Sequence, residues 1–160
     1  MRPRLLVVIV ATFLVFSFGV QSVTGTTIGG SIEKDLTNDE VYYGGYFRTG
    51  GLIKLELGVS KPYSNSSNRM KLFSYLLTDI NLGSVGISNG SIHLYFGASP
   101  DITLDTSAPS FPISNSSAYG KMGLQLNMFP VSVQLQSTGR FDFSGELTKI
   151  LGGLGIGLTF

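Results

Sequence analysis

Residues 154–160 read Leu154-Gly155-Ile156-Gly157-Leu158-Thr159-Phe160, with a large apolar residue at every second position. Side chains of a β-strand point alternately to its two faces, so residues two apart share a face. The stretch therefore predicts a strand with one wholly apolar face and one face of small residues. The apolar face consists of Leu154, Ile156, Leu158 and Phe160.

The composition favours one domain rich in β-structure. The chain has 160 residues, which suits a single domain. Charged residues make up 13% of the chain, about half the usual share, and there are 21 glycines. A net charge of +1 gives no field that would attract nucleic acid, and we expect no nucleic-acid partner. The chain has no Cys, which excludes disulfides and thiolate chemistry.

The first 25 residues have the layout of a secretory signal peptide. Arg2 and Arg4 precede an apolar run over residues 5–20, and Val23-Thr24-Gly25 supplies small residues at a cleavage site. The apolar run is shorter than the roughly 20 residues that a membrane-spanning helix needs. We therefore expect cleavage near Gly25 and a mature domain over residues 26–160, with an uncleaved membrane anchor as the alternative.

Eight stretches of the chain, including the C-terminal one, alternate with period two, and we expect a strand in each. They cover residues 26–34, 40–48, 51–60, 69–88, 91–99, 118–128, 131–144 and 150–160. Residues 69–88 are the least regular, since their phase slips between Leu82 and Val85 as at a β-bulge. Residues 70–77 fit either a strand or a short helix. A ten-strand count follows only if 69–88 splits and 100–117 contains a strand.

The connections between these stretches alternate in length. Short turns are expected at 49–51, 89–90 and 129–130, and longer polar loops at 36–39, 61–68, 100–117 and 145–149. The strands would thus form an up-and-down antiparallel sheet with short turns at one end and long loops at the other. Phe160 falls on the short-turn side. Membrane barrels show this asymmetry, with the longer loops outside the cell.

The polar faces indicate which way the apolar faces point. In a soluble barrel the apolar face points inward, and in a membrane barrel it points outward to lipid. The polar faces are rich in Gly, which weakens a water-facing strand but makes room inside a narrow barrel. Charge is missing from the apolar faces, where Lys or Arg at mid-bilayer costs about 2–4 kcal/mol. The pattern favours a transmembrane β-barrel.

Charged residues on the inward faces are expected to pair inside the barrel, where an unpaired charge is costly. This predicted network consists of Lys54, Glu56, Lys121, Arg140 and Asp142. Eight strands leave little more room than side chains need, so we expect the network to plug the lumen. The alternative is the lining of a narrow aqueous path. Aromatic girdles are expected at the strand ends, from Tyr43, Phe47, Tyr119, Phe129, Phe141 and Phe143.

The signal peptide, the strand pattern and the terminal motif together resemble the small eight-stranded bacterial outer-membrane barrels of the OmpA and OmpX type. The resemblance implies an outer-membrane location and contact with outer-membrane lipid. It also implies that Leu154, Ile156, Leu158 and Phe160 form the signal recognised by the barrel-assembly machinery. Barrels of this architecture include structural proteins, adhesins, surface-defence proteins, narrow pores and lipid-modifying enzymes, so the architecture does not select a role.

No residue pattern points to catalysis, a metal or a cofactor. His93 is the only His, and its place near the short turn at 89–90 predicts an interior or rim residue. The sequence predicts a non-enzymatic outer-membrane barrel of structural or surface-interaction role. Loops 61–68 and 100–117 would be extracellular, with an unidentified ligand. The alternatives are a narrow solute pore, a lipid-modifying enzyme and a soluble secreted ligand-binding barrel.

Overall fold

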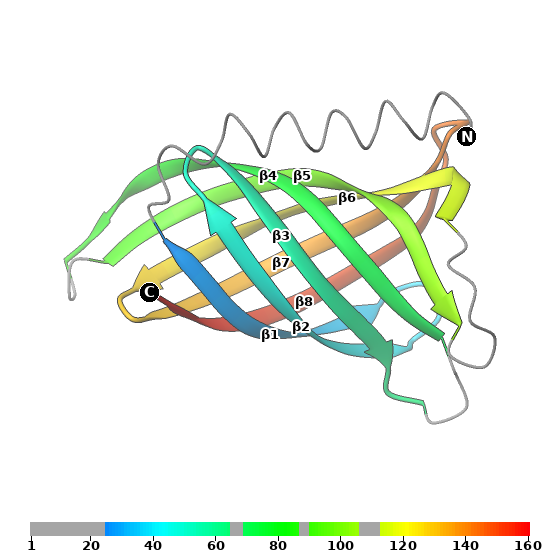
Figure 1. Cartoon of the computed structure of the whole chain (residues 1–160), viewed down its shortest axis with the longest axis horizontal. Coiled ribbons are helices and arrows are strands. Elements are labelled where there is room, and N and C mark those ends of the chain that lie inside the picture. Colours follow the sequence, from blue (N-terminus) through cyan, green and yellow to red (C-terminus); the bar gives the residue numbers. More distant parts are fainter. Residues whose placement is uncertain (1–24, 65–68, 87–89, 106–112) are drawn as a thin grey trace.

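The computed structural model describes residues 25–64, 69–86, 90–105 and 113–160, which form a closed antiparallel barrel (Figure 1). Its strands are β1 (Thr26–Asp35), β2 (Val41–Gly50), β3 (Ile53–Pro62), β4 (Arg69–Val85), β5 (Gly90–Asp105), β6 (Ile113–Met128), β7 (Val131–Asp142) and β8 (Leu147–Thr159). Each strand pairs with its neighbours in sequence, and β1 pairs with β8 to close the barrel. The prediction of an eight-stranded up-and-down barrel is confirmed.

The segment that sequence left open, residues 70–77, lies inside β4 and is a strand rather than a helix. A register shift between Asn81 and Gly83 interrupts the pairing of β4 with β5. Gly83 has φ +145°, and its N–H donates to Oδ1 of Asn81 at 2.8 Å. A glycine suits such a bulge because it has no Cβ to oppose positive φ. The bulge therefore lies at the start of the predicted slip, and β4 remains one strand.

Strands β5 and β6 extend well into the predicted loop 100–117. Pro100 and Ile102 flank a register shift, beyond which Ile102 pairs with Ile113. Proline has no N–H to donate to the neighbouring strand. The register shift after Pro100 allows the two strands to pair again from Ile102 onward. The Ser, Asn and Pro content of this stretch predicted a loop, but its two ends, residues 100–105 and 113–117, are strand. Similarly, β8 begins at Leu147 inside the predicted loop 145–149.

The two ends of the barrel differ. Phe160 lies at the same end as the tight connections β2–β3 and β6–β7, which we call the short-turn end (Figure 1). The opposite, long-loop end carries the connections β1–β2, β3–β4, β5–β6 and β7–β8. The predicted signal peptide, most of loop 61–68 and the centre of loop 100–117 lie outside the described residues. Within the described part of the chain, no helix is long and apolar enough to cross a membrane.

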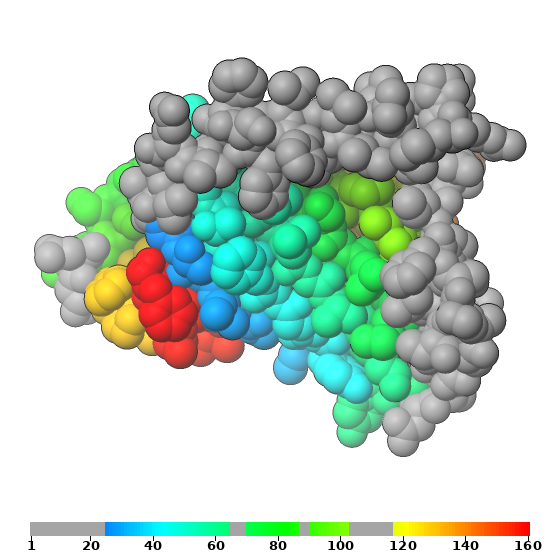
Figure 2. All heavy atoms as spheres, in the orientation of Figure 1, coloured from blue at the N-terminus to red at the C-terminus, as the bar shows by residue number. Residues whose placement is uncertain are grey.

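The outer surface of the barrel is apolar. Leu124 pairs with Leu135, and Leu135 pairs with Leu154, so outward-pointing leucines adjoin around the wall. Leu135 is 58% exposed and Leu154 61% exposed. In Figure 2 the atoms of β1, β2 and β3 lie side by side across the visible wall, next to those of β8. A surface of this kind suits contact with lipid and not with water.

The inside of the barrel is filled by tyrosines and polar side chains. Tyr46 and Tyr95 are buried there. A Cβ added to Gly29 would lie 2.5 Å from the ring of Tyr46, and one added to Gly123 would lie 2.6 Å from the hydroxyl of Tyr95. These inward glycines therefore make room for the large rings. Tyr119 is also buried inside, which corrects its assignment to a girdle, because it shares the inward face of β6 with Lys121.

Candidate functional site

The middle of the lumen holds one carboxylate between two cations. Arg48 donates from Nε to Oε2 of Glu56 at 2.8 Å, and its Nη2 contacts the same oxygen. Lys121 Nζ donates to Oε1 of Glu56 at 2.6 Å. All three side chains are buried, and Glu56 is 0% exposed. We call Arg48, Glu56 and Lys121 the central network, and their charges compensate one another in a site closed to solvent.

Amide side chains join the central network to the surrounding wall. Gln125 and Gln134 accept from the guanidinium of Arg48, the second at 3.0 Å. Gln134 in turn donates to the hydroxyl of Tyr46 at 2.7 Å. The guanidinium also lies 4.7 Å from the ring centroid of Tyr95, within cation–π range. Contacts that come from β2, β3, β5, β6 and β7 thus hold these side chains across the lumen.

The five residues of the predicted network do not form one cluster. Glu56 and Lys121 meet in the middle of the barrel. Lys54 pairs with Asp79 at 2.9 Å at the short-turn end, and Arg140 pairs with Asp101 at 2.7 Å at the long-loop end. Four of the five predicted residues therefore separate into three layers along the barrel axis.

Asp142 lies outside the lumen network, which corrects its assignment. The register of β7 against β8 shifts between Arg140 and Phe141, and β7 ends at Asp142. The carboxylate accepts from Ser144 Oγ at 2.6 Å and from the N–H of Glu146 at 2.8 Å. Asp142 stays in register with the buried Ser117 of β6, but its carboxylate bonds to the turn that leads to β8 and not to the charged side chains of the lumen.

Sequence reasoning missed Arg48, the main partner of Glu56. Arg48 lies at the end of the predicted strand 40–48 and shares its face with Tyr46. Register brings it opposite Glu56, because the two are paired residues of β2 and β3. The period-two pattern placed Arg48 on the inward face. This position was therefore a sufficient reason to include Arg48 among the charged residues of the predicted network.

At the short-turn end, three side chains lie in a row. His93 Nδ1 is 2.7 Å from Oδ2 of Asp79, within ion-pair distance but not aligned for a hydrogen bond. The opposite ring nitrogen of His93 is 2.9 Å from Oγ of Ser91. This order of groups is that of a Ser–His–Asp triad. Lys54 binds the same oxygen of Asp79, however, and so competes for the negative charge that would stabilise an imidazolium.

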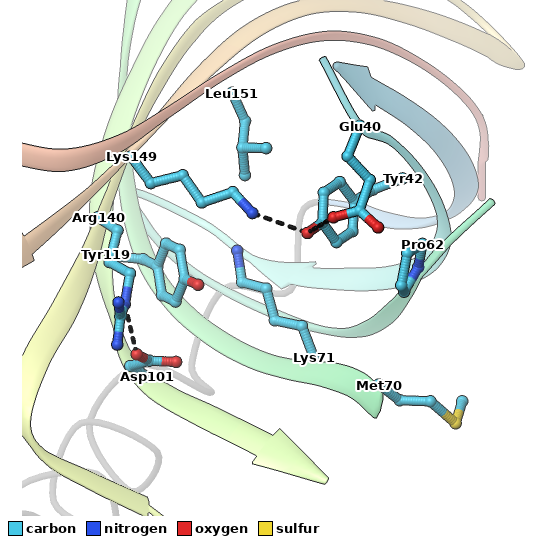
Figure 3. Close-up of a pocket in the computed structure, with 10 residues that line it drawn as sticks. All are labelled: Glu40, Tyr42, Pro62, Met70, Lys71, Asp101, Tyr119, Arg140, Lys149 and Leu151. Carbon is cyan, nitrogen blue, oxygen red and sulfur yellow. Dashed lines mark hydrogen bonds and ion pairs between the residues drawn. The ribbon is translucent and has the colours of Figure 1, made fainter. Parts of the chain in front are cut away.

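The long-loop end opens into a cavity of about 370 Å³, which we call the mouth cavity (Figure 3). Side chains from β2 to β8 line it. Its charged lining residues are Glu40, Lys71, Asp101, Arg140 and Lys149. Tyr42 and Tyr119 supply aromatic walls, and Leu151 supplies an apolar one. Among the side chains that the structure describes, no three His, Cys, Asp or Glu residues are grouped to hold a metal ion.

The four apolar residues of the C-terminal motif all point outward, three of them from β8 and Phe160 from the position directly after it. Leu154, Ile156, Leu158 and Phe160 are each at least half exposed. The backbone of Phe160 also forms part of the seam: its N–H donates to the carbonyl of Thr26 at 2.8 Å. The last strand thus closes the barrel while presenting its apolar side chains at the surface.

Two solved structures have the same architecture. A transmembrane β-barrel designed de novo matches with a TM-score of 0.63, covering 88% of this chain and 98% of that one at 10% identity. The N-terminal β-barrel domain of Pseudomonas aeruginosa OprF matches with a TM-score of 0.56, covering 88% and 100% at 16% identity. No protein-family model and no curated protein matches the sequence. At these identities the likeness shows the fold alone, that of transmembrane β-barrels.

Proposed function

We propose that the protein is an integral outer-membrane β-barrel with a closed lumen, whose role is structural or interactive at its long-loop end. The observation that carries the proposal is the reversed polarity of the barrel. Leu124, Leu135 and Leu154 point outward, while the charged pairs of the central network are buried within. In a water-soluble barrel the apolar face would point inward. A rigid, filled barrel suits a scaffold that presents loops.

Two partners follow from this proposal. Outer-membrane lipid would contact the apolar wall, and the barrel-assembly machinery would recognise the strand that carries Leu154, Ile156, Leu158 and Phe160. The exposure of these four side chains supports both. The short-turn end would face the periplasm and the long-loop end the exterior, as in other outer-membrane barrels.

Fractionation of a Gram-negative host that expresses the full chain tests the location. We expect the protein in the outer-membrane fraction, with an N-terminus near Thr26 after signal-peptide cleavage. Its gel migration should differ before and after boiling, as for a folded membrane barrel. A monomer that stays soluble in buffer without detergent would favour a secreted ligand-binding barrel instead.

A narrow solute pore is the second candidate, because charged residues span the lumen. The contacts of Glu56 with both Arg48 and Lys121 argue against it, since an ion would have to break them to pass. We therefore expect no discrete openings when the folded protein is inserted into planar bilayers. Reproducible unitary conductance would show that the central network leaves a path through the lumen.

We assign no catalytic role to Ser91, His93 and Asp79 within this proposal. The bond of Lys54 to Asp79 makes the group a closed ion-pair cluster at the short-turn end. Incubation of the folded protein with outer-membrane lipids is expected to leave their acyl composition unchanged.

A further inference from the structure

We propose that the mouth cavity binds a small zwitterion, a molecule with one ammonium and one carboxylate group. The inference deepens the proposed function, on which it rests only for the side of the membrane that the cavity faces. It names the chemistry that the long-loop end would recognise. The basis is the balance of charge among the residues that line the cavity.

Two of the three cations of the mouth cavity already have carboxylate partners. Arg140 Nε lies 2.7 Å from Oδ2 of Asp101, and Lys149 Nζ lies 2.9 Å from Oδ2 of Asp35. Lys149 also donates to the hydroxyl of Tyr42 at 2.7 Å. These pairs neutralise one another and leave no charge for a ligand.

Lys71 is the third cation, and it has no carboxylate within ion-pair distance among the residues that the structure describes. Its Nζ lies 3.4 Å from the ring centroid of Tyr119 and 3.5 Å from the hydroxyl of Tyr75. Figure 3 shows the amine directed toward the middle of the cavity, between Tyr42 and Tyr119. An ammonium has three donors, so Lys71 retains capacity to bind an anionic group.

Glu40 is the matching unbalanced anion. It accepts from the hydroxyl of Tyr42 at 2.5 Å and from Ser64 Oγ at 3.1 Å, both neutral donors. No described Lys or Arg forms an ion pair with it. Among the described residues, the lining therefore carries one positive and one negative side chain that form no ion pair, and a ligand of zero net charge with both signs would complement them.

Asp101 adds a second acceptor for an ammonium group. Its Oδ2 accepts from Arg140 and from Ser117 Oγ, each at 2.7 Å. Its Oδ1 is buried and has no hydrogen-bond partner among the described residues. Asp101 lines the cavity, so its carboxylate adds to the negative charge that Glu40 offers to the ammonium of a bound zwitterion.

The volume of the cavity and its lining residues narrow the class of ligand. A volume of about 370 Å³ admits a molecule of amino-acid size. Tyr42 and Tyr119 offer surfaces for a short aliphatic segment between the two charged groups. A ligand with only one charge would leave either Lys71 or the acidic side unpaired, so the cavity should discriminate against it.

Isothermal titration of the full-length protein, folded in detergent micelles, tests the inference. The probes are γ-aminobutyrate, which carries both charges, and n-butylamine and butyrate, which carry one each. We expect γ-aminobutyrate to bind at least about tenfold more tightly than either single-charge probe. The series from glycine to 5-aminovalerate then measures the preferred spacing of the two groups.

Three variants assign the contacts. Lys71→Met removes the partner of the ligand carboxylate, so this variant should bind γ-aminobutyrate no better than n-butylamine. Glu40→Gln removes the partner of the ligand ammonium, so the affinity of this variant for γ-aminobutyrate should fall toward its affinity for butyrate. Lys34→Met is the matched control, because Lys34 lies at the same end but on the outer face, where it pairs with Asp39. This variant should bind as the unmodified protein does.

Equal affinity for the three probes, or no binding by a protein that is folded, would overturn the inference. An equal loss in Lys34→Met and Lys71→Met would overturn it too. Heat-dependent gel migration reports folding of the barrel separately. A protein that migrates as a folded barrel but binds no zwitterion would therefore refute only this inference, whereas a chain that is soluble without detergent would refute the proposed function.

Discussion

Leu135→Arg is expected to prevent the chain from folding into lipid vesicles, whereas Leu36→Arg should leave folding almost intact. Leu135 lies near the middle of β7 and points outward, and Leu36 lies in the connection between β1 and β2. The two side chains are similarly exposed, at 58% and 65%. An arginine costs about 2–4 kcal/mol at the centre of a bilayer but only about 0–1 kcal/mol near its surface.

The measurement is the fraction of each variant that shows heat-dependent gel migration after dilution from urea into vesicles. The matched exposure matters, because in a water-soluble barrel both substitutions would place arginine in solvent and both would be tolerated. Equal behaviour of the two variants, or better folding of Leu135→Arg, would contradict the assignment of the outer wall to lipid.

Glu56→Gln is expected to destabilise the folded barrel by about 3–5 kcal/mol, the usual cost of breaking a buried ion pair by removing one partner. The glutamine keeps the shape of the side chain but leaves Arg48 and Lys121 as uncompensated buried cations. Equilibrium unfolding in urea, followed on the protein in vesicles, measures the change. Asp142→Asn is the control and should change the midpoint little, because Asp142 lies at the end of β7 and asparagine keeps the Oδ1 that accepts from Ser144 and Glu146.

A double variant separates charge from packing in the central network. Glu56→Gln combined with Lys121→Gln removes one of the two unpaired cations, so it should be more stable than Glu56→Gln alone. Residues in one ion-pair network couple in this way. If the second change only adds to the loss, then Glu56 contributes through packing and not through its charge.

The alternation of apolar residues was sufficient to predict the barrel. The runs over residues 118–128 and 131–144 keep one phase, and their central parts lie in β6 and β7. Phase alone also assigned Glu56 and Lys121 to the inside, where they meet. These features depend only on neighbours along one strand, so they are visible in the sequence.

What the sequence did not reveal depends on register and on the height of a residue along the barrel axis. Arg140 and Asp101 are far apart in the chain, and only the pairing of β5, β6 and β7 brings them together. Composition misled at 100–117, because Ser, Asn and Pro can occupy the ends of long strands. The mouth cavity is a further example, since residues from seven strands meet there.

The most direct test of the central claim is the accessibility of spin labels along β7. The chain has no Cys, so single cysteines at positions 133–138 can each carry one nitroxide in the protein reconstituted into lipid. If the outer wall contacts lipid and the lumen is filled, labels at 133, 135 and 137 will collide with oxygen dissolved in the bilayer. Labels at 134, 136 and 138 will be shielded both from oxygen and from a water-soluble nickel chelate. Collision with the nickel chelate at 133, 135 and 137 would contradict the account, because it would place the apolar wall in water.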